Sequence, residues 1–438
     1  MKRMIATLAT GVTLFAAPAQ AQTDVQLWHG MSGPLGELLA KFADDFNASQ
    51  SEYQVTQTYK GNYADTLTAA IAAFRAGKPP AIVQVYEVGT ASMMAAKGAV
   101  YPVHKLMDDT GEPFDPSAFI APVFGYYSDT DGRLLSMPFN SSTPVMFWNK
   151  EHFGKAGLDP EKGPETWEEL GEMAKTIIDA GVADCGLTVE YAPWTLLESQ
   201  GTWHNMPTAT QQNGFGGAGT ELVFNDPMRV KLLTTLSNWQ KDGRFKYYGR
   251  EIQSLANFTS GECSFHFASS ALKRRIELAL GKDGYMMGYA PYFEEFADGP
   301  QNSLIGGATL WVLTGLDEDT YKGVAKFFTF LSSVEVQTEW HQNTGYVPIT
   351  NAAYEKSKAD GYYETDPFAE IAITSLTLNP PTEHSKGLRL GNFVQIREVE
   401  DSEMEALWAG QQTPEQTMDN IVEKGNALLR KFDAATSN

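Results

Sequence analysis

The fold is decided by the stretch VQLWHGMSGPLGELLAKFADDFNASQSEYQVTQTY, residues 25–59. Residues 25–29 alternate apolar and polar side chains as a strand does, and residues 53–59 alternate again. Between them, Ser32 and Pro34 are typical of an N-cap and a first helical turn, and the apolar residues that follow recur on one helical face. The stretch therefore predicts a strand, a helix and a second strand.

The same alternation of strands and helices continues along the chain. Residues 65–75 have a helical pattern, and the nearly continuous apolar run 81–86 predicts a buried strand. A further strand is expected at 144–147, and Thr166 with Glu169 three residues later predicts a capping box. Such alternation implies a mainly parallel sheet covered by helices, and 438 residues exceed what one core usually holds. We therefore expect two α/β lobes.

The chain begins with the features of an export signal. Lys2 and Arg3 precede a largely apolar run at 5–17, and residues 19–21 read Ala-Gln-Ala, a small-residue cleavage site. The apolar run is too short to span a membrane, and no later segment is apolar for long enough. No cysteine near the cleavage point offers a lipid anchor. We predict cleavage after Ala21 and a protein that diffuses in the periplasm.

Charge and motifs exclude several classes of function. A net charge of -21 argues against nucleic acid or anionic lipid as a partner, because both select basic surfaces. The seven histidines never fall three or four residues apart, so no helix presents a two-histidine metal face. The G-x-G-x-x-G match at 214–219 lacks a preceding strand and a following helix, and no nucleophile elbow or P-loop occurs. We expect no catalytic residue, no metal and no cofactor.

The two cysteines, Cys185 and Cys263, leave two alternatives open. An exported protein reaches an oxidising compartment, where the pair can form a disulfide. Two separate buried thiols fit the sequence equally well.

Segments that mix aromatic rings, hydroxyls and glycines follow the expected strands. They are residues 60–63, 86–90, 139–143, 268–270, 305–308, 344–346 and 387–392. Ligands of open α/β sheets bind beyond the carboxyl ends of the strands, which is where several of these segments lie. Polyol hydroxyls need a carboxylate and an aromatic face, whereas a phosphate needs serine hydroxyls, backbone N–H groups and arginine. Both sets of groups are present in these segments.

Seven runs closely resemble the periplasmic glycerol-3-phosphate-binding proteins of Ugp ABC importers, namely 59–63, 84–90, 125–129, 138–144, 301–307, 341–350 and 386–397. The resemblance extends from about Leu27 to Phe432. It implies an α/β, two-lobed periplasmic-binding-protein fold (type II, resembling maltose-binding protein) that encloses its ligand between the lobes. The ligand contacts that it implies are Tyr63, Glu87, Ser142, Ser269, Gly307, Tyr346 and Arg397.

One departure from the family concerns a pair of tryptophans. Where the best-known member has two, this chain has Tyr191 and Trp194, and we add both to the candidate ligand-binding residues. This change bears on the ligand preference and leaves the class of ligand as it is. Arg389 competes with Arg397 for the role of phosphate ligand.

Each candidate also has an ordinary structural interpretation. Tyr63 can simply pack, Glu87 can face solvent or cap a helix, and Ser142 and Ser269 can be turn hydroxyls. Gly307 can serve a sharp turn, although a missing side chain also lets a backbone N–H approach a phosphate.

We predict a solute-binding protein that captures glycerol-3-phosphate or glycerophosphodiesters such as glycerophosphocholine. It is expected to act as a monomer and to deliver its ligand to the membrane permease subunits of an ABC importer. The alternatives are a periplasmic glycerophosphodiester hydrolase and an oligosaccharide-binding protein of the same fold. The expected lobes are 22–136 with 299–343 and 137–298 with 344–438, so that the chain crosses the hinge three times.

Overall fold

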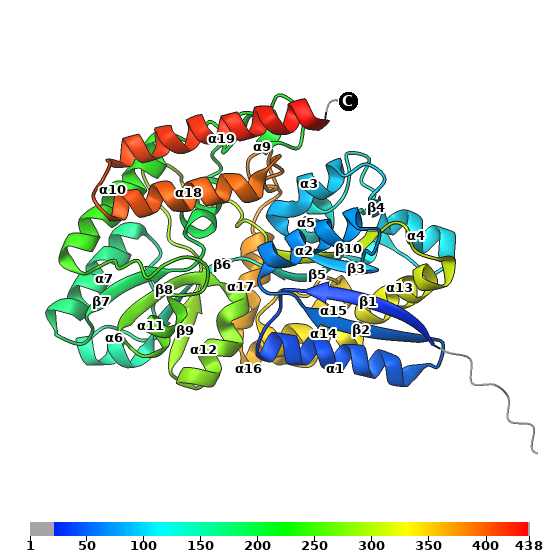
Figure 1. Cartoon of the computed structure of the whole chain (residues 1–438). Coiled ribbons are helices and arrows are strands. Elements are labelled where there is room, and N and C mark those ends of the chain that lie inside the picture. The colour runs from blue at the N-terminus through cyan, green and yellow to red at the C-terminus, as the bar shows by residue number, and fades with distance from the viewer. Residues whose placement is uncertain (1–21, 437–438) are drawn as a thin grey trace, which may run out of the picture.

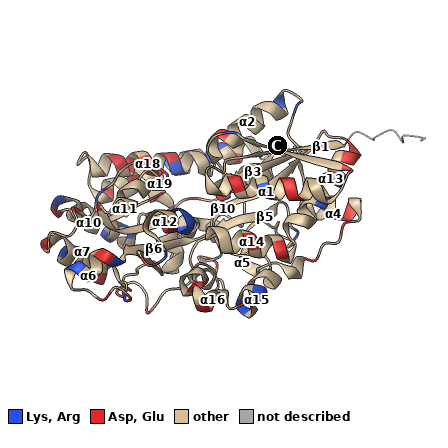
Figure 2. Cartoon of the chain, turned by 90° about the horizontal axis from the view of Figure 1, so that it is seen from below, with Lys and Arg blue, Asp and Glu red and all other residues tan. Residues whose placement is uncertain are grey.

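The computed structural model describes residues 22–436, in which two β-sheets and their helices form two halves that lie side by side (Figure 1). The predicted export signal and its cleavage after Ala21 lie outside the described residues. Within residues 22–436, no helix has both the length and the apolar character needed to cross a membrane. Acidic and basic positions occur along helices of both halves (Figure 2).

The first half is built on a mixed sheet in the order β2-β1-β3-β10-β4, with β5 also paired to β10. Its strands are β1 (Thr23–His29), β2 (Tyr53–Tyr59), β3 (Ile82–Tyr86), β4 (Val100–Tyr101), β5 (Met137–Ser142) and β10 (Gly306–Leu313). Its helices are α1 (Pro34–Ser49), α2 (Tyr63–Arg75), α3 (Thr90–Ala95), α4 (Val103–Thr110), α5 (Ala121–Tyr126), α13 (Glu318–Leu331) and α14 (Val334–Thr344). The strand, helix and strand predicted from residues 25–59 are β1, α1 and β2, and β1 pairs with β2 in parallel.

The second half is built on a sheet in the order β7-β8-β6-β9. Its strands are β6 (Pro144–Asn149), β7 (Cys185–Val189), β8 (Cys263–Ser269) and β9 (Tyr285–Gly288). Its main helices are α6 (Lys150–Ala156), α7 (Trp167–Asp179), α10 (Pro227–Asp242), α11 (Leu255–Thr259), α12 (Lys273–Leu280), α18 (Phe393–Trp408) and α19 (Pro414–Thr436). Helices α15 (Asn351–Ala359), α16 (Tyr362–Thr365) and α17 (Ile371–Leu376) lead from α14 towards α18.

The expectation of mainly parallel sheets is wrong for strands that arrive after a crossing. β10 runs antiparallel to β3, β4 and β5, and β6 runs antiparallel to both β8 and β9. The parallel pairs are β1 with β2, β1 with β3 and β7 with β8, and each joins strands of the same half. A strand that enters a sheet from the other half has no connecting helix to set its direction.

Two predicted helix starts differ in detail from the structure. Gly33, and not Ser32, is the N-cap residue of α1, because the chain turns there at a φ of 56° that favours glycine. The Thr166 hydroxyl does cap α7 by accepting the N–H of Glu169. The Glu169 carboxylate accepts the N–H of Glu165 instead of that of Thr166, so the reciprocal half of the expected capping box is wrong.

The chain passes between the halves directly from β5 to β6, with Thr143 between them. The lobe boundaries that we expected at 137, 299 and 344 remain a prediction. Packing nevertheless ties residues 346–349 to the first half, since Val347 N–H donates to the Ser141 carbonyl (2.8 Å) and Val347 lies in the same apolar core as Val25. Residues after α14 thus continue to pack on the first sheet before the chain leaves it.

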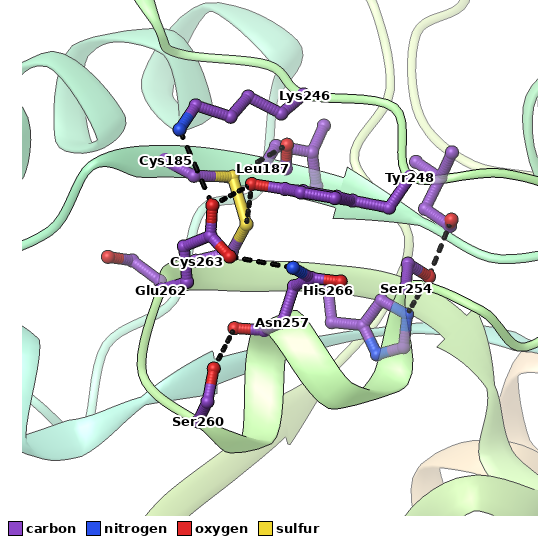
Figure 3. Close-up of a disulfide and its surroundings, with 12 residues drawn as sticks. Cys185, Leu187, Lys246, Tyr248, Ser254, Asn257, Ser260, Glu262, Cys263 and His266 are labelled. Atoms are coloured by element: carbon purple, nitrogen blue, oxygen red, sulfur yellow. Dashed lines mark hydrogen bonds and ion pairs between the residues drawn. A yellow bond between two sulfur atoms is a disulfide. The ribbon is translucent and has the colours of Figure 1, made fainter.

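Cys185 and Cys263 form a disulfide, which decides between the two alternatives that the sequence left open. They are directly opposite each other on the parallel strands β7 and β8, with their Cα atoms 4.4 Å apart (Figure 3). Both are fully buried. The bond joins positions separated by 78 residues in the chain, so it closes a long loop inside the second half.

Replacing both cysteines with alanine is expected to lower the free energy of unfolding by about 3 kcal/mol, because a cross-link over a long loop removes conformations from the unfolded chain. Urea unfolding of the Cys185→Ala/Cys263→Ala variant beside the wild type measures the difference. A reductant should lower the stability of the wild type alone and leave the double variant unchanged. Equal stability of the two proteins under oxidising conditions would contradict the expectation.

Candidate ligand-binding site

A cavity of about 260 Å³ lies between the two halves, and all nine candidate residues line it. They are Tyr63, Glu87, Ser142, Tyr191, Trp194, Ser269, Gly307, Tyr346 and Arg397. Strand direction explains why distant segments meet here: β5 ends at Ser142 and β10 begins at Gly306, with these two residues opposite each other. Across the cavity, β8 ends at Ser269. The strand ends that the sequence singled out therefore converge on one space.

One wall of the cavity is aromatic and is held in place by a chain of hydrogen bonds. The ring of Tyr63 stacks on that of Tyr86, with centroids 5.5 Å apart. The Tyr63 hydroxyl accepts from Asn140 Nδ2 (2.9 Å), Asn140 Oδ1 accepts from Gln84 Nε2 (2.8 Å), and Gln84 Oε1 accepts the N–H of Gly30 (2.9 Å). These bonds tie the tyrosine to β5, to β3 and to the residue that follows β1, so its ring is positioned before any ligand arrives.

Two glycines let the backbone of β10 approach its neighbours closely. A Cβ atom on Gly306 would lie 2.3 Å from Cζ2 of Trp194, and one on Gly307 would lie 1.9 Å from the carbonyl oxygen of Asn140. Gly307 also has a φ of +90°, a conformation that favours glycine. The backbone conformation at Gly307 thus accounts for a glycine there, while the approach of its N–H to a phosphate remains a prediction.

Arg397 occupies one end of the cavity and is held by two carboxylates. Its Nε and Nη2 donate to Glu198 (2.9 and 2.6 Å), and its Nη1 lies 2.8 Å from Oε1 of Glu87. All three side chains are at least nine-tenths buried. Burial raises the pKa of Glu87, although the adjacent guanidinium opposes this, and the nearby Asp401 has its pKa raised to about 7 by burial. Carboxyl groups thus outnumber the guanidinium at this end.

A second cation, Arg275, lines the cavity and was missed by the sequence analysis. Its Nη2 donates to the carbonyl (3.0 Å) and the hydroxyl (3.2 Å) of Ser32, across the gap between the halves. Its Nε is buried without a hydrogen-bond partner, and it forms no ion pair with any carboxylate in the described part of the chain. The available signal was the basic run at 273–275 in a strongly acidic chain, just after β8, which Figure 2 shows in blue at the start of α12.

A further contact between the halves lies at the rim of the cavity. Asn62 Nδ2 donates to Glu251 Oε1 (2.9 Å), and the Glu251 carbonyl accepts the N–H of Tyr191 (3.0 Å). Tyr191 and Glu251 both have a positive φ, 40° and 51°, which strains a residue that carries a side chain. The hydrogen bond between them maintains this strained pair beside the cavity, which local sequence patterns do not indicate.

Glu190 is a buried acid in the cavity wall, and one of its carboxyl oxygens has no hydrogen-bond partner in the described residues. Its Oε1 accepts the N–H of Ser269 (2.5 Å), and its Oε2 has no hydrogen-bond partner anywhere in residues 22–436. Burial raises the pKa of Glu190 to about 8, while the Ser269 N–H and Arg275 act to lower it. The group is therefore largely a neutral acid at pH 7, able to donate a hydrogen bond as well as accept one.

The Glu190→Gln variant is expected to lose less stability than the wild type as the pH rises from 5 to 8. The pKa of Glu190 lies near 4.5 in the unfolded chain and near 8 in the folded one. Its contribution to the free energy of unfolding is therefore complete below pH 4.5 and is lost as the pH rises to 8. That loss amounts to a few kcal/mol, by about 1.4 kcal/mol per unit of pKa. Urea unfolding of both proteins at the two pH values measures it, and parallel pH profiles would show that Glu190 does not titrate with folding.

Residues 41–368 match the family of bacterial extracellular solute-binding proteins, which covers most of this chain and the greater part of both halves. The chain belongs to this family. Among its relatives in the family, the sn-glycerol-3-phosphate-binding periplasmic protein UgpB of Yersinia pseudotuberculosis is 47% identical over 422 residues, 96% of this chain and 95% of that protein. The protein of the same name from Escherichia coli strain 536 is 47% identical over 430 residues, 98% of this chain and 97% of that protein.

Solved structures of solute-binding proteins share the fold. UgpB from Mycobacterium tuberculosis, in complex with glycerophosphocholine, superposes with a TM-score of 0.78 at 18% identity and covers 94% of this chain and 99% of that one. Maltose-bound MalE3 of T. maritima gives a TM-score of 0.75 at 18% identity over 93% of this chain and 100% of that one. The predicted α/β fold of type II, like that of maltose-binding protein, is confirmed.

The structure also separates the two arginines that competed for one role. Arg397 lines the cavity between the halves, whereas Arg389 lines a different one. Three charged groups in the cavity were not predicted, namely Glu190, Glu251 and Arg275. Glu198, which holds Arg397, was not predicted either.

Proposed function

We propose that this solute-binding protein captures glycerol-3-phosphate or a glycerophosphodiester outside the cytoplasm and passes it unchanged to an ABC importer. The observation that carries the proposal is the convergence of all nine candidate residues on one cavity between the halves. Relatives at 47% identity are named for sn-glycerol-3-phosphate binding in the periplasm, which supports both the ligand and the location. We further propose that the protein acts as a monomer that docks on permease subunits.

The size and lining of the cavity favour a small polar ester. Its volume of about 260 Å³ lies below the usual range for drug-sized ligands, so an oligosaccharide fits it less well. Aromatic faces at Tyr63 and Trp194 can cover the glycerol carbons, while Glu87 can accept from its hydroxyls. The serines Ser142 and Ser269 and the backbone at Gly307 can donate to a phosphate.

We propose that the phosphate lies towards Arg275 and the glycerol hydroxyls towards Arg397. Arg397 keeps two N–H groups beyond those that bond Glu198 and Glu87, but these carboxylates partly cancel its charge. Arg275 has no carboxylate partner within the described chain, so its charge is available to an anionic group. This orientation differs from our expectation that Arg397 would be the main phosphate ligand.

Arg275→Met is expected to weaken glycerol-3-phosphate binding by about 10- to 100-fold, because it removes charge-assisted hydrogen bonds to the phosphate. Calorimetric titration measures the change. Asn62→Leu is the matched control, since it removes another hydrogen bond between the halves and leaves the charge of the cavity unchanged. An equal loss in the two variants would mean that Arg275 acts through closure alone.

Two titrations and one assay test the function itself. We expect glycerol-3-phosphate and glycerophosphocholine to bind with one ligand per chain, and maltose to bind far more weakly. Incubation with glycerophosphocholine is expected to release no choline, which separates capture from hydrolysis. Tight binding of maltose alone would favour the oligosaccharide-binding alternative, and steady release of choline would favour the hydrolase.

A further inference from the structure

A second cavity, of about 440 Å³, lies between the halves and shares no lining residue with the first. On one side it is lined by α5 and the residues after it, up to 130, and on the other by residues 376–389. The chain from α17 to α18, orange in Figure 1, passes between the two halves. The proposed function makes no use of this cavity or of Arg389, which the sequence analysis had singled out as a candidate phosphate ligand.

Two cations of this cavity lie over one aromatic ring. Lys386 Nζ is 4.7 Å from the centroid of the Phe215 ring, and the guanidinium carbon of Arg389 is 4.2 Å from it. Burial lowers the pKa of Lys386, and the charge of Arg389 lowers it further. The like charge of Arg389 thus disfavours the charged form of Lys386, so the arrangement gains from an anion within reach of both.

Neither cation forms an ion pair with a carboxylate in residues 22–436. Arg389 is nine-tenths buried, its Nη2 donates only to the carbonyls of Tyr126 (2.5 Å) and Ser128 (2.9 Å), and its Nε lacks a partner. Asp129 also lines the cavity and its charge favours that of Arg389, but its carboxylate binds the Arg133 guanidinium at 2.8 Å and forms no ion pair with Arg389. A buried guanidinium bonded only to neutral carbonyls leaves its charge unmatched.

The backbone around these cations is built in a strained form. Residues Gln211, Gln212 and Asn213 have φ values of 52°, 56° and 56°, which is unusual for three successive residues with side chains. Asn213 is fully buried and holds the turn by accepting from the N–H groups of Thr208 and Ala209, both at 2.9 Å. The turn places Gln212 Oε1 2.6 Å from Lys386 Nζ, so Lys386 is fixed at the edge of the cavity. Residues 211–213 therefore form an anchored turn.

We propose that this second cavity binds a small tetrahedral oxyanion, phosphate, sulfate or the phosphate group of an ester, between Lys386 and Arg389. The anion neutralises two cations that form no ion pair with a carboxylate in the described residues. Because the two cavities have no residue in common, both can be filled in one molecule. The proposal does not depend on which ligand occupies the first cavity.

Equilibrium dialysis with radiolabelled sulfate, at an ionic strength held constant with chloride, tests this site. We expect one sulfate per chain, retained when glycerol-3-phosphate is present, and an affinity at least about tenfold lower in Lys386→Met. Lys358→Met is the matched control, because Lys358 Nζ also lies over a ring, that of Tyr354 at 4.8 Å, and the change removes the same charge. The control is expected to bind sulfate as the wild type does.

The competing outcomes are distinct. Absence of saturable sulfate binding would overturn the proposal, as would an equal loss in the Lys386 and Lys358 variants, which would indicate general charge attraction. A loss in Arg275→Met with none in Lys386→Met would place the sulfate in the first cavity and also overturn it. Displacement of sulfate by inorganic phosphate identifies a free oxyanion as the occupant, and displacement only by a phosphate ester other than glycerol-3-phosphate identifies such an ester; either supports the site.

Discussion

Arg397→Met is expected to lower the free energy of unfolding by about 3–5 kcal/mol and to abolish ligand binding. Removal of one partner from a buried ion pair leaves an uncompensated charge, which is strongly destabilising. Here Glu198 would lose two hydrogen bonds from the guanidinium and Glu87 would lose one contact with it. Both carboxylates would then lie buried beside Glu400 without a cation. Urea unfolding and calorimetric titration measure the two effects.

The control for this prediction is Arg250→Met. Arg250 also forms a bidentate ion pair, donating to Glu405 at 2.8 and 2.6 Å, but about a third of each side chain is exposed. Exposed pairs contribute less than about 1 kcal/mol, so this variant should be close to the wild type. The deficit of Arg397→Met should also shrink at pH 5, where protonation relieves the unpaired carboxylates. Similar losses in both variants would mean that burial does not set the strength of the Arg397 pair.

The sequence predicted those parts of the fold that local patterns determine. The alternation at 25–29 and 53–59 and the apolar face of the intervening helix were confirmed as β1, β2 and α1. The direction of β10 was not predictable, because it depends on where the chain returns from the other half. Ser32 illustrates a smaller limit: its hydroxyl suits an N-cap, but the φ of Gly33 moves the helix start and leaves Ser32 to meet Arg275.

The candidate site was predictable to the extent that it lies at strand ends. Ser142, Ser269 and Gly307 are polar or small residues where strands end or begin, and the structure brings them to one cavity. Many residues at strand ends are polar or small, and the resemblance to a known family indicated which of them to select as candidates. Partners of charged groups could not be read in this way: Glu198 lies within a helical segment 199 residues away from Arg397, and only packing brings the two together.

Electrostatics changes the interpretation of the arginines that the sequence singled out. Arginine alone suggests a phosphate ligand, yet Arg397 is largely matched by two carboxylates, whereas Arg275 and Arg389 have no carboxylate partner in the described residues. The charge that an anionic ligand meets depends on these pairings more than on the residue type. In a chain with a net charge of -21, the unmatched cations are therefore the informative ones.

Gly307→Ala is expected to lower the free energy of unfolding by about 4 kcal/mol and to prevent ligand binding. The φ of +90° costs a residue with a side chain about 1–2 kcal/mol. The added Cβ atom would also lie 1.9 Å from the Asn140 carbonyl oxygen, a backbone atom in a paired strand that cannot move without disturbing β5, and such overpacking costs about 1–3 kcal/mol or more. Any movement of β5 would shift Ser142 and narrow the cavity.

Gly217 separates the conformational part of this effect from the steric part. Its φ of +91° is almost the same, but a Cβ atom there would meet nothing in residues 22–436 within 4 Å apart from its two neighbours in the chain. Gly217→Ala should therefore cost only about 1–2 kcal/mol and leave binding unchanged. Urea unfolding of both variants, with calorimetric titration of glycerol-3-phosphate, makes the comparison. Equal losses of stability in the two variants would show that the contact with Asn140 contributes nothing, because backbone conformation alone would then account for the loss in Gly307→Ala.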